Sequence, residues 1–366
     1  MINSNHYMHP ARPGVCFDFM DKTIHTKLSK PFTTESGHTF SEPEVAFKTW
    51  GKLNKSRDNV ILICHALTGN ADADDWFPGL FEENGLIKRD EHFVICINVP
   101  GSCYGSIGPS SINPETGNPY QGSFPEITIR DMVRFQQQVL DELEIKGIEA
   151  VIGGSMGGMQ ALEFAIMDSR VRAAIPIAMG KAHTPWAIGI SHVQRKAIYN
   201  DPDWNDGFYN RESPPECGLA NARMMAMLTY RAPSDYEQKF GRNLQDGSDE
   251  YQVESYLNYQ GEKLINRFDA NSYVILTRAM DTHDVARGRK NYKDVLGKIK
   301  IPVLIVGIDT DLLYPVSEQK ELHELIPNSE YQEITSPHGH DAFLIEFEQL
   351  NKITKKFFEK LKTEAI

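Results

Sequence analysis

Short, nearly continuous apolar runs recur along the chain and are separated by longer stretches of mixed character. These runs lie at 59–64, 93–98, 150–152, 173–177 and 302–307. A strand that is covered by helices on both faces of a parallel sheet has this texture, because neither face meets water. We therefore predict that these runs form the central strands of one sheet.

Stretches with helical spacing lie between and after the runs. Apolar residues predict helices over Ile129–Leu143, over Val316–Leu325 and from about Asp341 to Leu361. A further strand is predicted at Tyr331–Thr335, before the last helix. Strands that alternate with helices indicate an α/β fold with a mostly parallel sheet and helices on both faces.

Two more strand-like stretches lie near the N-terminus and flank a turn-rich segment. Thr23–Leu28 and Val45–Trp50 predict an antiparallel pair at an edge of the sheet. Residues 1–20 have no clear periodicity, and we expect them to form a loosely held arm.

The texture changes after Gly180. Residues 181–299 carry helical patterns, methionines and many charges, and strand texture returns at residue 302. We therefore predict a core of residues 1–180 and 300–366, with a helical lid insertion of residues 181–299. Ligands of such sheets bind at the carboxyl ends of the strands, so the lid is expected to cover that edge.

A glycine-rich turn joins the run at 150–152 to a helical pattern. Gly153, Ser155 and Gly157 fit the pattern G-x-S-x-G, in which a nucleophilic serine lies on a tight strand-to-helix turn. Such a turn strains the backbone and needs neighbours without side chains, while the helix N-terminus favours developing negative charge. A glycine-rich turn without reactive groups, or a phosphate cradle, would share the spacing. The flanking strand and helix favour the nucleophile.

An acid and a base should follow such a serine in that order. Asp309 and Asp311 follow the predicted strand at 302–307. His338 and His340 follow the next predicted strand. An aspartate that starts a turn, or a histidine in a solvated loop, would look the same. The residues themselves do not choose between the two acids or between the two histidines.

An oxyanion hole requires backbone N–H groups close to the serine. One is expected from Met156, the residue after the nucleophile, and a second from the loop His65–Asn70 that follows an early strand. Leu67 is the expected second donor in that loop. An ordinary loop at the end of a strand is the alternative interpretation.

The amino-acid composition is that of a globular enzyme, and the net charge argues against two classes of binding partner. Hydrophobic residues make up 40% of the 366 residues, and the net charge of −12 argues against a nucleic-acid or anionic-membrane surface. The five cysteines form no C-x-x-C pair, which fits a reducing compartment. We find no signal pattern and no membrane-spanning run, and we expect a cytoplasmic protein. No cluster has metal-ligand spacing, so we expect no metal and no bound cofactor.

Longer motifs give the chain a specific resemblance. They are Cys64–Gly69, Gly105–Ser111, Phe124–Asp131, Gly153–Glu163, Asp201–Trp204, Leu228–Arg231, Val253–Leu257, Gln260–Lys263, Arg267–Tyr273, His283–Arg289 and Gly339–Leu344. With these motifs the sequence resembles the homoserine O-acyltransferase family of the α/β-hydrolase superfamily, in the branch related to homoserine O-acetyltransferase. The resemblance runs from about Thr23 to the final helix and implies the α/β-hydrolase fold.

The family pattern implies a role for each matching position. Asp311 matches its acid and His340 matches its base, beside the nucleophile Ser155. Arg223 matches its substrate-binding arginine, and Asp341 matches the residue that holds the substrate amine. A guanidinium for a carboxylate and a carboxylate for an ammonium suit an amino-acid substrate.

The resemblance implies ping-pong acyl transfer in methionine biosynthesis. Ser155 would take an acyl group from an acyl-coenzyme A, and the homoserine hydroxyl, deprotonated by His340, would attack the acyl-enzyme. Acetyl-CoA and L-homoserine are the leading substrates. Succinyl-CoA stays open as donor, because it differs from acetyl-CoA by a carboxylate and one well-placed side chain could switch the preference. Serine stays open as acceptor, because it is one methylene shorter and such a difference changes binding by only about 1–3 kcal/mol.

The resemblance also bears on coenzyme binding and assembly. The phosphates of coenzyme A need cationic partners, for which the candidates are Arg231, Arg242, Lys263, Arg287 and Arg289. Any of these would more ordinarily be a member of a surface ion pair. The family further suggests a homodimer built through the lid helices.

Two other classes of protein compete with this interpretation. A serine hydrolase or thioesterase would carry the same serine, aspartate and histidine. Only Arg223, Asp341 and the lid motifs favour an amino-acid acceptor. A non-enzymatic binding protein on the same fold would not need all three reactive residues together.

Overall fold

The computed structural model describes residues 22–83 and 85–364, and the predicted N-terminal arm lies outside them. Within these residues, eight strands form one sheet in the order β1-β4-β6-β5-β7-β8-β9-β10. Their bounds are β1 Ile24–Lys27, β4 Glu44–Gly51, β5 Val60–Cys64, β6 Phe93–Ile97, β7 Ile148–Gly154, β8 Ala174–Ile177, β9 Val303–Ile308 and β10 Ser329–Ile334. From β6 to β10 along the sheet, all neighbours are parallel.

The N-terminal edge of the sheet is antiparallel, as predicted. β4 pairs antiparallel with β1 on one side and with β6 on the other. A separate two-stranded ladder of β2 (Phe32–Thr33) and β3 (Thr39–Phe40) lies in the turn-rich segment between β1 and β4. The mostly parallel α/β sheet expected from the apolar runs is therefore confirmed.

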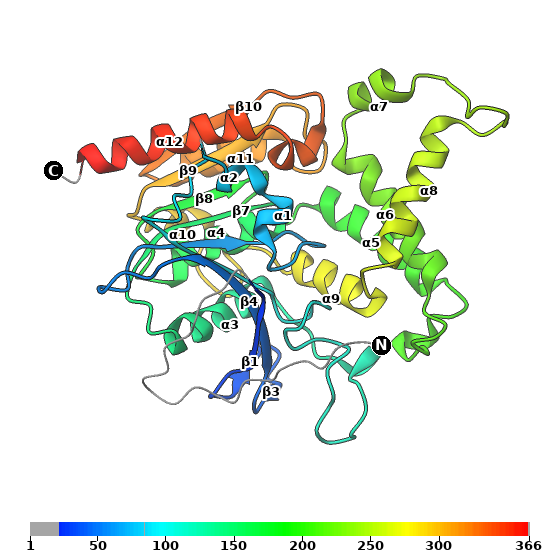
Figure 1. Ribbon diagram of the computed structural model, residues 1–366, viewed down its shortest axis with the longest axis horizontal. Coiled ribbons are helices and arrows are strands. Elements are labelled where there is room, and N and C mark those ends of the chain that lie inside the picture. The colour runs from blue at the N-terminus through cyan, green and yellow to red at the C-terminus, as the bar shows by residue number, and fades with distance from the viewer. Residues whose placement is uncertain (1–21, 84, 365–366) are drawn as a thin grey trace.

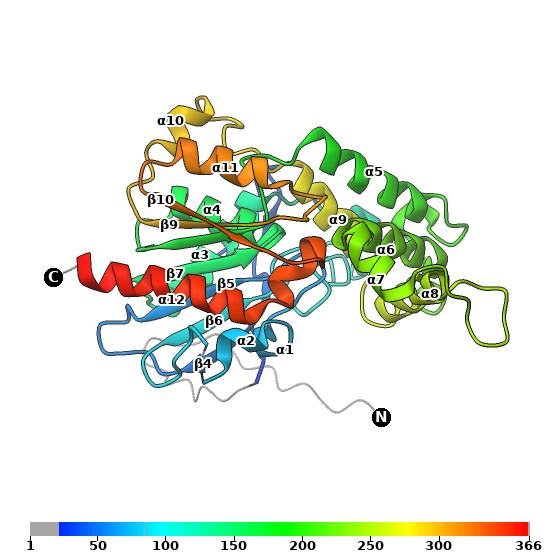
Figure 2. The same cartoon turned by 90° about the horizontal axis from the view of Figure 1, so that it is seen from above.

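Helices cover both faces of the sheet (Figure 2). One face carries α3 (Ile129–Glu142), α4 (Met156–Met167), α10 (Tyr292–Leu296) and α11 (Val316–Leu325). The other carries α12 (Phe347–Glu364) with the short α1 (Ala73–Trp76) and α2 (Pro78–Phe81). The buried apolar residues accordingly form two clusters, one on each side of the strands. Among the described helices, none combines the length and the apolar character needed to cross a membrane.

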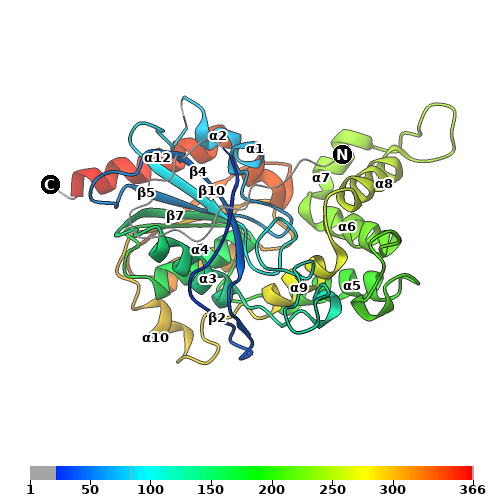
Figure 3. The same cartoon turned by 60° about the horizontal axis from the view of Figure 1, so that its bottom comes forward.

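The segment between β8 and β9 contains helices but no strand of the sheet. It holds α5 (Pro185–Tyr199), α6 (Glu216–Tyr230), α7 (Pro233–Phe240), α8 (Gln252–Ile265) and α9 (Ala270–Asp281), followed by α10. Figures 1 and 3 show α5 to α8 projecting beyond one end of the strands, with α9 between them and the core. Short polar residues start several of these helices: the side chain of Thr184 caps α5 and that of Asp269 caps α9.

The carboxyl ends of the parallel strands lie side by side. Cys64 of β5 pairs with Gly153 of β7, and Gly154 pairs with Ile177 of β8. Ile308 of β9 pairs with Ile334 of β10. Loops from distant parts of the sequence therefore meet at this edge, which is where sheets of this type bind ligands.

The last predicted helix begins later than its periodicity indicates. Gly339–Leu344 form a separate 3₁₀ turn, η3, and α12 starts only at Phe347. The turn buries His340 and Phe343 against the core, so tertiary contacts replace the first turns of a continuous helix. Two shorter 3₁₀ turns, η1 (Gln121–Ser123) and η2 (Asn205–Gly207), lie in loops.

Candidate active site

Ser155 lies between β7 and α4 in a strained backbone conformation. Its φ of 57° and ψ of −125° are unusual for a residue with a side chain. The backbone N–H of Ser155 donates to the carbonyl of Ile177 at 2.9 Å, which ties the turn to β8. The surrounding structure thus holds a strained serine at the carboxyl edge of the sheet, a feature that clusters at functional sites.

The glycines around Ser155 are required by close packing. A Cβ atom at Gly157 would lie 2.1 Å from the carbonyl oxygen of Cys64, and one at Gly153 would lie 2.4 Å from the backbone of Gly157. Strand β5 therefore presses directly against the turn. The spacing of glycines in the sequence reflects this contact between two neighbouring strand ends.

Asp311 and His340 come together from consecutive strand ends. Oδ2 of Asp311 lies 2.7 Å from Nδ1 of His340, and both side chains are buried. The other carboxylate oxygen accepts hydrogen bonds from the backbone N–H groups of Leu313 at 2.8 Å and Tyr314 at 2.9 Å. Because a carboxylate only accepts, Nδ1 of His340 donates, and Nε2 is left as the acceptor.

The surroundings of His340 shift its pKa upward. Burial alone lowers the pKa of the imidazole, but the neighbouring carboxylate of Asp311 outweighs burial and raises the pKa above its ordinary value. The rings of Tyr230, Tyr314 and Phe343 surround the imidazole at centroid distances of 5.7, 5.4 and 5.7 Å. These rings limit the orientations that His340 can adopt.

The turn that carries His340 packs onto the turn that carries Ser155. A Cβ atom at Gly154 would lie 2.4 Å from the ring of Phe343, three residues after His340. The candidate nucleophile and the Asp311–His340 pair therefore occupy one small region of the carboxyl edge.

The other acid and the other histidine have different partners. Oδ1 of Asp309 accepts from the backbone N–H of Ser336 at 3.0 Å, which joins the loops after β9 and β10. Nδ1 of His338 lies 2.7 Å from Oδ1 of Asp235, a residue of α7. Asp309 and His338 thus connect the loop to its surroundings, and His338 links it to the inserted helices.

The two expected oxyanion donors lie next to the serine turn. Met156 is the first residue of α4, so its N–H has no partner within the helix. Leu67 lies in a turn closed by a 3.0 Å hydrogen bond from the N–H of Gly69 to the carbonyl of Ala66. A Cβ atom at Gly157 of the serine turn would lie 3.2 Å from the carbonyl oxygen of His65, which is two residues before Leu67.

Arg223 and Asp341 come from two different segments and lie near the histidine. Arg223 comes from α6, and its guanidinium lies 5.5 Å from the ring centroid of Tyr230, whose other neighbour is His340. Within the described part of the chain, no carboxylate forms an ion pair with Arg223. Burial raises the pKa of the Asp341 carboxyl, and the nearby guanidinium groups of Arg231 and Arg223 oppose that rise.

Arg231 has a place at the site that residue patterns did not reveal. Its Nε lies 3.3 Å from Oδ2 of Asp341, and its Nη1 lies 3.5 Å from Oδ2 of Asp235. In the sequence it was one of several candidate partners for phosphate. The motif Leu228–Arg231 was the available signal, but the approach of α6 to the loop after β10 is a tertiary contact.

The remaining cationic candidates divide into two groups. Arg287 pairs with Glu35 at 2.6 Å and Arg289 pairs with Glu163 at 2.8 Å. Arg242 donates to the hydroxyl of Tyr251 at 3.1 Å, and no carboxylate of the described residues pairs with Lys263. Arg242 and Lys263 lie on the inserted segment.

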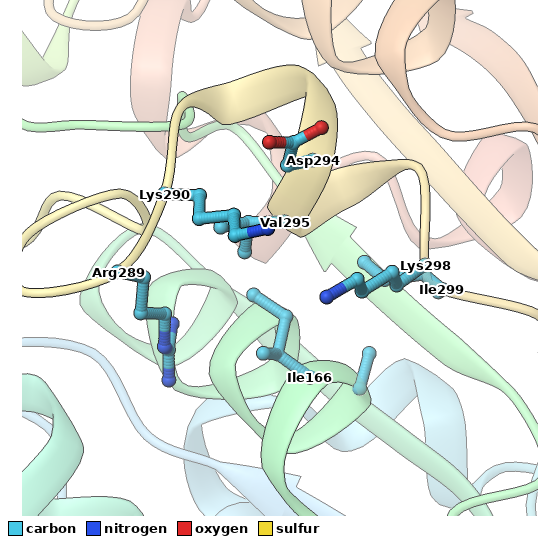
Figure 4. A pocket seen from close by; sticks show the side chains of 8 residues that line it. Ile166, Arg289, Lys290, Asp294, Val295, Lys298 and Ile299 are labelled. Atoms are coloured by element: carbon cyan, nitrogen blue, oxygen red, sulfur yellow. The ribbon is translucent and has the colours of Figure 1, made fainter.

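A cavity of about 370 Å³ lies at the far end of α4 from Ser155 (Figure 4). Ile166 and Val295 form part of its apolar lining, and the side chains of Lys290 and Lys298 extend across it from opposite sides. It contains none of the candidate reactive residues. In the described residues, no group of three or more His, Cys, Asp or Glu side chains is arranged to hold a metal ion.

Comparison with known proteins decides the family. A family model described as alpha/beta hydrolase fold matches residues 59–347. A homoserine O-acetyltransferase from Chloroherpeton thalassium is 51% identical over 348 residues, which cover 95% of this chain and 92% of that protein. The chain belongs to the homoserine O-acetyltransferase family.

Solved structures of this fold include both transferases and esterases. The crystal structure of homoserine O-acetyltransferase from Bacillus anthracis matches with a TM-score of 0.84 at 28% identity, covering 90% of this chain and 95% of that chain. Esterase E22 matches with a TM-score of 0.82 at 26% identity, covering 92% and 99%. Because both activities occur on nearly the same backbone, the acceptor must be argued from individual side chains.

Proposed function

We propose that the protein transfers an acetyl group from acetyl-CoA to the hydroxyl of L-homoserine through an acyl-enzyme on Ser155. The observation that carries this proposal is that Arg223 and Asp341 both lie close to His340. A guanidinium without an ion-pair partner among the described residues and a carboxylate both lie near His340, and together they match the two charges of an amino-acid acceptor.

The first half-reaction forms the acyl-enzyme. Oγ of Ser155 attacks the thioester carbonyl while Nε2 of His340 takes the hydroxyl proton. The backbone N–H groups of Met156 and Leu67 stabilise the oxyanion of the tetrahedral intermediate. The intermediate collapses with cleavage of the carbon–sulfur bond, and the proton on His340 passes to the coenzyme A thiol.

The second half-reaction repeats these steps with the alcohol as nucleophile. The homoserine hydroxyl gives its proton to Nε2 of His340 and attacks the acetyl carbonyl of the acyl-enzyme. The second tetrahedral intermediate collapses, its Ser155 oxygen leaves and regains a proton from His340, and O-acetylhomoserine is released. Asp311 stabilises the imidazolium that forms in both half-reactions.

Acceptor recognition follows from charge complementarity. The guanidinium of Arg223 would bind the homoserine carboxylate, and Asp341 would bind its ammonium. Arg231 supports the second role because its charge favours the ionised form of Asp341. Water carries neither charged group, so these residues favour homoserine over hydrolysis.

The coenzyme would approach across the inserted helices. Arg242 and Lys263 are the candidates for its phosphates, since Arg287 and Arg289 are paired with carboxylates elsewhere. The acetyl donor rests on the family, and succinyl-CoA remains the alternative.

We further propose that the protein is cytoplasmic and that it forms a homodimer joined through the lid. The dimer is supported by exposed apolar side chains on the lid helices, among them Val193 (52%), Leu228 (52%) and Tyr259 (56%).

The deciding experiment measures release of free thiol from acetyl-CoA and from succinyl-CoA. Each donor is tested with L-homoserine, with L-serine and without an acceptor. We expect release that requires acetyl-CoA and homoserine together at steady state. Faster release from succinyl-CoA would show that succinyl-CoA is the preferred donor. Faster release with serine would show that serine is the preferred acceptor.

Sustained release without an acceptor would overturn the transferase proposal. The protein would then be a thioesterase or esterase, as its similarity to esterase E22 permits. Ser155→Ala is the control, because it should abolish release with every acceptor while the fold is retained. Near-normal turnover by this variant would exclude Ser155 as the nucleophile.

A further inference from the structure

One arginine of the inserted segment reaches the loop that carries Leu67. Arg267 lies between α8 and α9, and its Nη1 donates to the carbonyl oxygen of Thr68 at 2.8 Å. The same nitrogen lies 2.7 Å from the hydroxyl of Tyr104, and Nη2 lies 3.4 Å from Oγ1 of Thr68. A residue of the lid therefore binds the main chain of the oxyanion loop.

The core holds the beginning of this loop. Nε2 of His65 accepts from the backbone N–H of Val99 at 3.1 Å, so Nδ1 carries the proton and donates to the carbonyl of Ala66 at 2.9 Å. Burial lowers the pKa of His65 to about 4, which keeps this neutral form at physiological pH. The side chain of Gln160 also donates to the carbonyl of His65, at 3.2 Å.

These bonds orient the expected oxyanion donor. The carbonyl of Ala66 accepts from His65 and from the N–H of Gly69, so the peptide plane between Ala66 and Leu67 is held. In a trans peptide the N–H points opposite to the carbonyl, and the Leu67 N–H is therefore directed away from those two donors. The peptide between Thr68 and Gly69 is held at its N–H by the Ala66 carbonyl, and its own carbonyl is the group that Arg267 holds.

We propose that Arg267 is a positioning residue for the oxyanion hole. By holding the Thr68 carbonyl, it fixes the Thr68–Gly69 peptide, whose N–H closes the turn onto Ala66, and so keeps the Leu67 N–H aimed at the acyl carbonyl on Ser155. The lid is then part of the catalytic apparatus, because the hole is fully ordered only when the α8–α9 connection is docked. This inference rests on the proposed acyl-enzyme mechanism.

A positioning role predicts a specific kinetic pattern. Both half-reactions pass through an oxyanion on the same acyl carbonyl, so loss of Arg267 should slow both by a similar factor. Removing one oxyanion donor outright costs about 10²–10³ in rate, and loosening a donor should cost less, about 10- to 100-fold. The KM values for donor and acceptor should change little.

The test compares full-length Arg267→Gln with the wild-type protein and with a matched control. Acyl-enzyme formation is followed as the thiol burst from acetyl-CoA, and also as phenolate release from p-nitrophenyl acetate, which has no phosphates. Deacylation is followed by adding homoserine to the acyl-enzyme. Arg278→Gln is the control, because Arg278 is a lid arginine that pairs with Glu126 at 3.5 Å on the surface.

We expect Arg267→Gln to lose about 10- to 100-fold in each half-reaction and with both acetyl donors, and Arg278→Gln to keep wild-type rates. Affinity for a boronic acid that forms a tetrahedral adduct with Ser155 should fall by the same factor. Arg267→Lys can still donate one hydrogen bond to Thr68 and should recover part of the rate. Thermal unfolding of each variant separates loss of positioning from loss of fold.

Three results would overturn the proposal. An increase in KM for acetyl-CoA alone, with p-nitrophenyl acetate unaffected, would make Arg267 a phosphate ligand. A loss confined to deacylation would place it in the acceptor site, and unchanged rates would leave the contact without a catalytic role. Absence of any burst in the wild-type protein would instead contradict the proposed function.

Discussion

At the scale of single residues, the chemistry depends on the proton of His340. The imidazole must be neutral to accept a proton from Ser155 or from the acceptor hydroxyl, so activity is lost as the pH falls through its pKa. Asp311 raises that pKa above the ordinary value of about 6.5. We therefore predict that the acidic limb of kcat/KM for the wild-type protein has its midpoint above about pH 6.5.

Asp311→Asn should move this limb in the opposite direction. Without the carboxylate, burial is left as the main influence on His340 and lowers its pKa, so the acidic limb moves to lower pH. The rate should also fall by about 10³- to 10⁴-fold, because an amide does not hold the required tautomer. A pH–rate profile of both proteins checks the shift, and an unmoved limb would assign the titration to another group.

Arg223→Ala should separate the two half-reactions. A charged hydrogen bond contributes about 1.5–3 kcal/mol, so the KM for homoserine should rise by about 10- to 100-fold. The burst from acetyl-CoA should stay within a few-fold of the wild-type rate, because the acyl-enzyme forms without the acceptor. Equal losses in both steps would indicate a coenzyme-binding or structural role for Arg223.

At the scale of elements, the serine turn depends on the contact between β5 and β7. Gly157→Ala would place a methyl group 2.1 Å from the carbonyl oxygen of Cys64, which belongs to a central strand. Forced overpacking of this kind costs about 1–3 kcal/mol, and it would also displace Ser155. We expect a lower free energy of unfolding in urea and strongly reduced acyl-enzyme formation.

A second glycine provides the control for that substitution. Gly189 lies within α5, where a new Cβ atom would meet no atom within 4 Å. Gly189→Ala should therefore raise the free energy of unfolding by about 0.5–1 kcal/mol through helix propensity. Similar destabilisation by both substitutions would show that the crowding at Gly157 is not the cause.

At the scale of the whole molecule, the proposed homodimer can be tested through the lid. Tyr259 lies on α8 with 56% of its surface exposed, and an aspartate there would place a charge in an apolar interface. Tyr259→Asp should shift the protein toward monomers in sedimentation-velocity experiments. Ile112→Asp, at an equally exposed residue outside the inserted helices, should leave the oligomeric state unchanged.

Local patterns in the sequence predict most of the core elements. The helix Val316–Leu325 has the predicted bounds, and β5, β6, β8 and α3 differ from prediction by only a residue or so. These segments follow their own periodicity because burial on one or both faces is encoded in successive residues. The start of α12 was missed because the turn at Gly339–Leu344 is set by contacts with distant strands.

The sequence by itself determined the α/β architecture, the strained serine turn and the family, since each depends on short-range patterns or on long shared motifs. Spacing alone left Asp309 and Asp311 equivalent, and family resemblance had to choose between them. In the tertiary structure, Asp311 pairs with His340 whereas Asp309 bonds to Ser336. Which side chains meet depends on how loops from separate strand ends turn toward one another. The contacts of Arg231 with Asp341 and of Arg267 with Thr68 were likewise decided only by folding, because they join residues far apart in the chain.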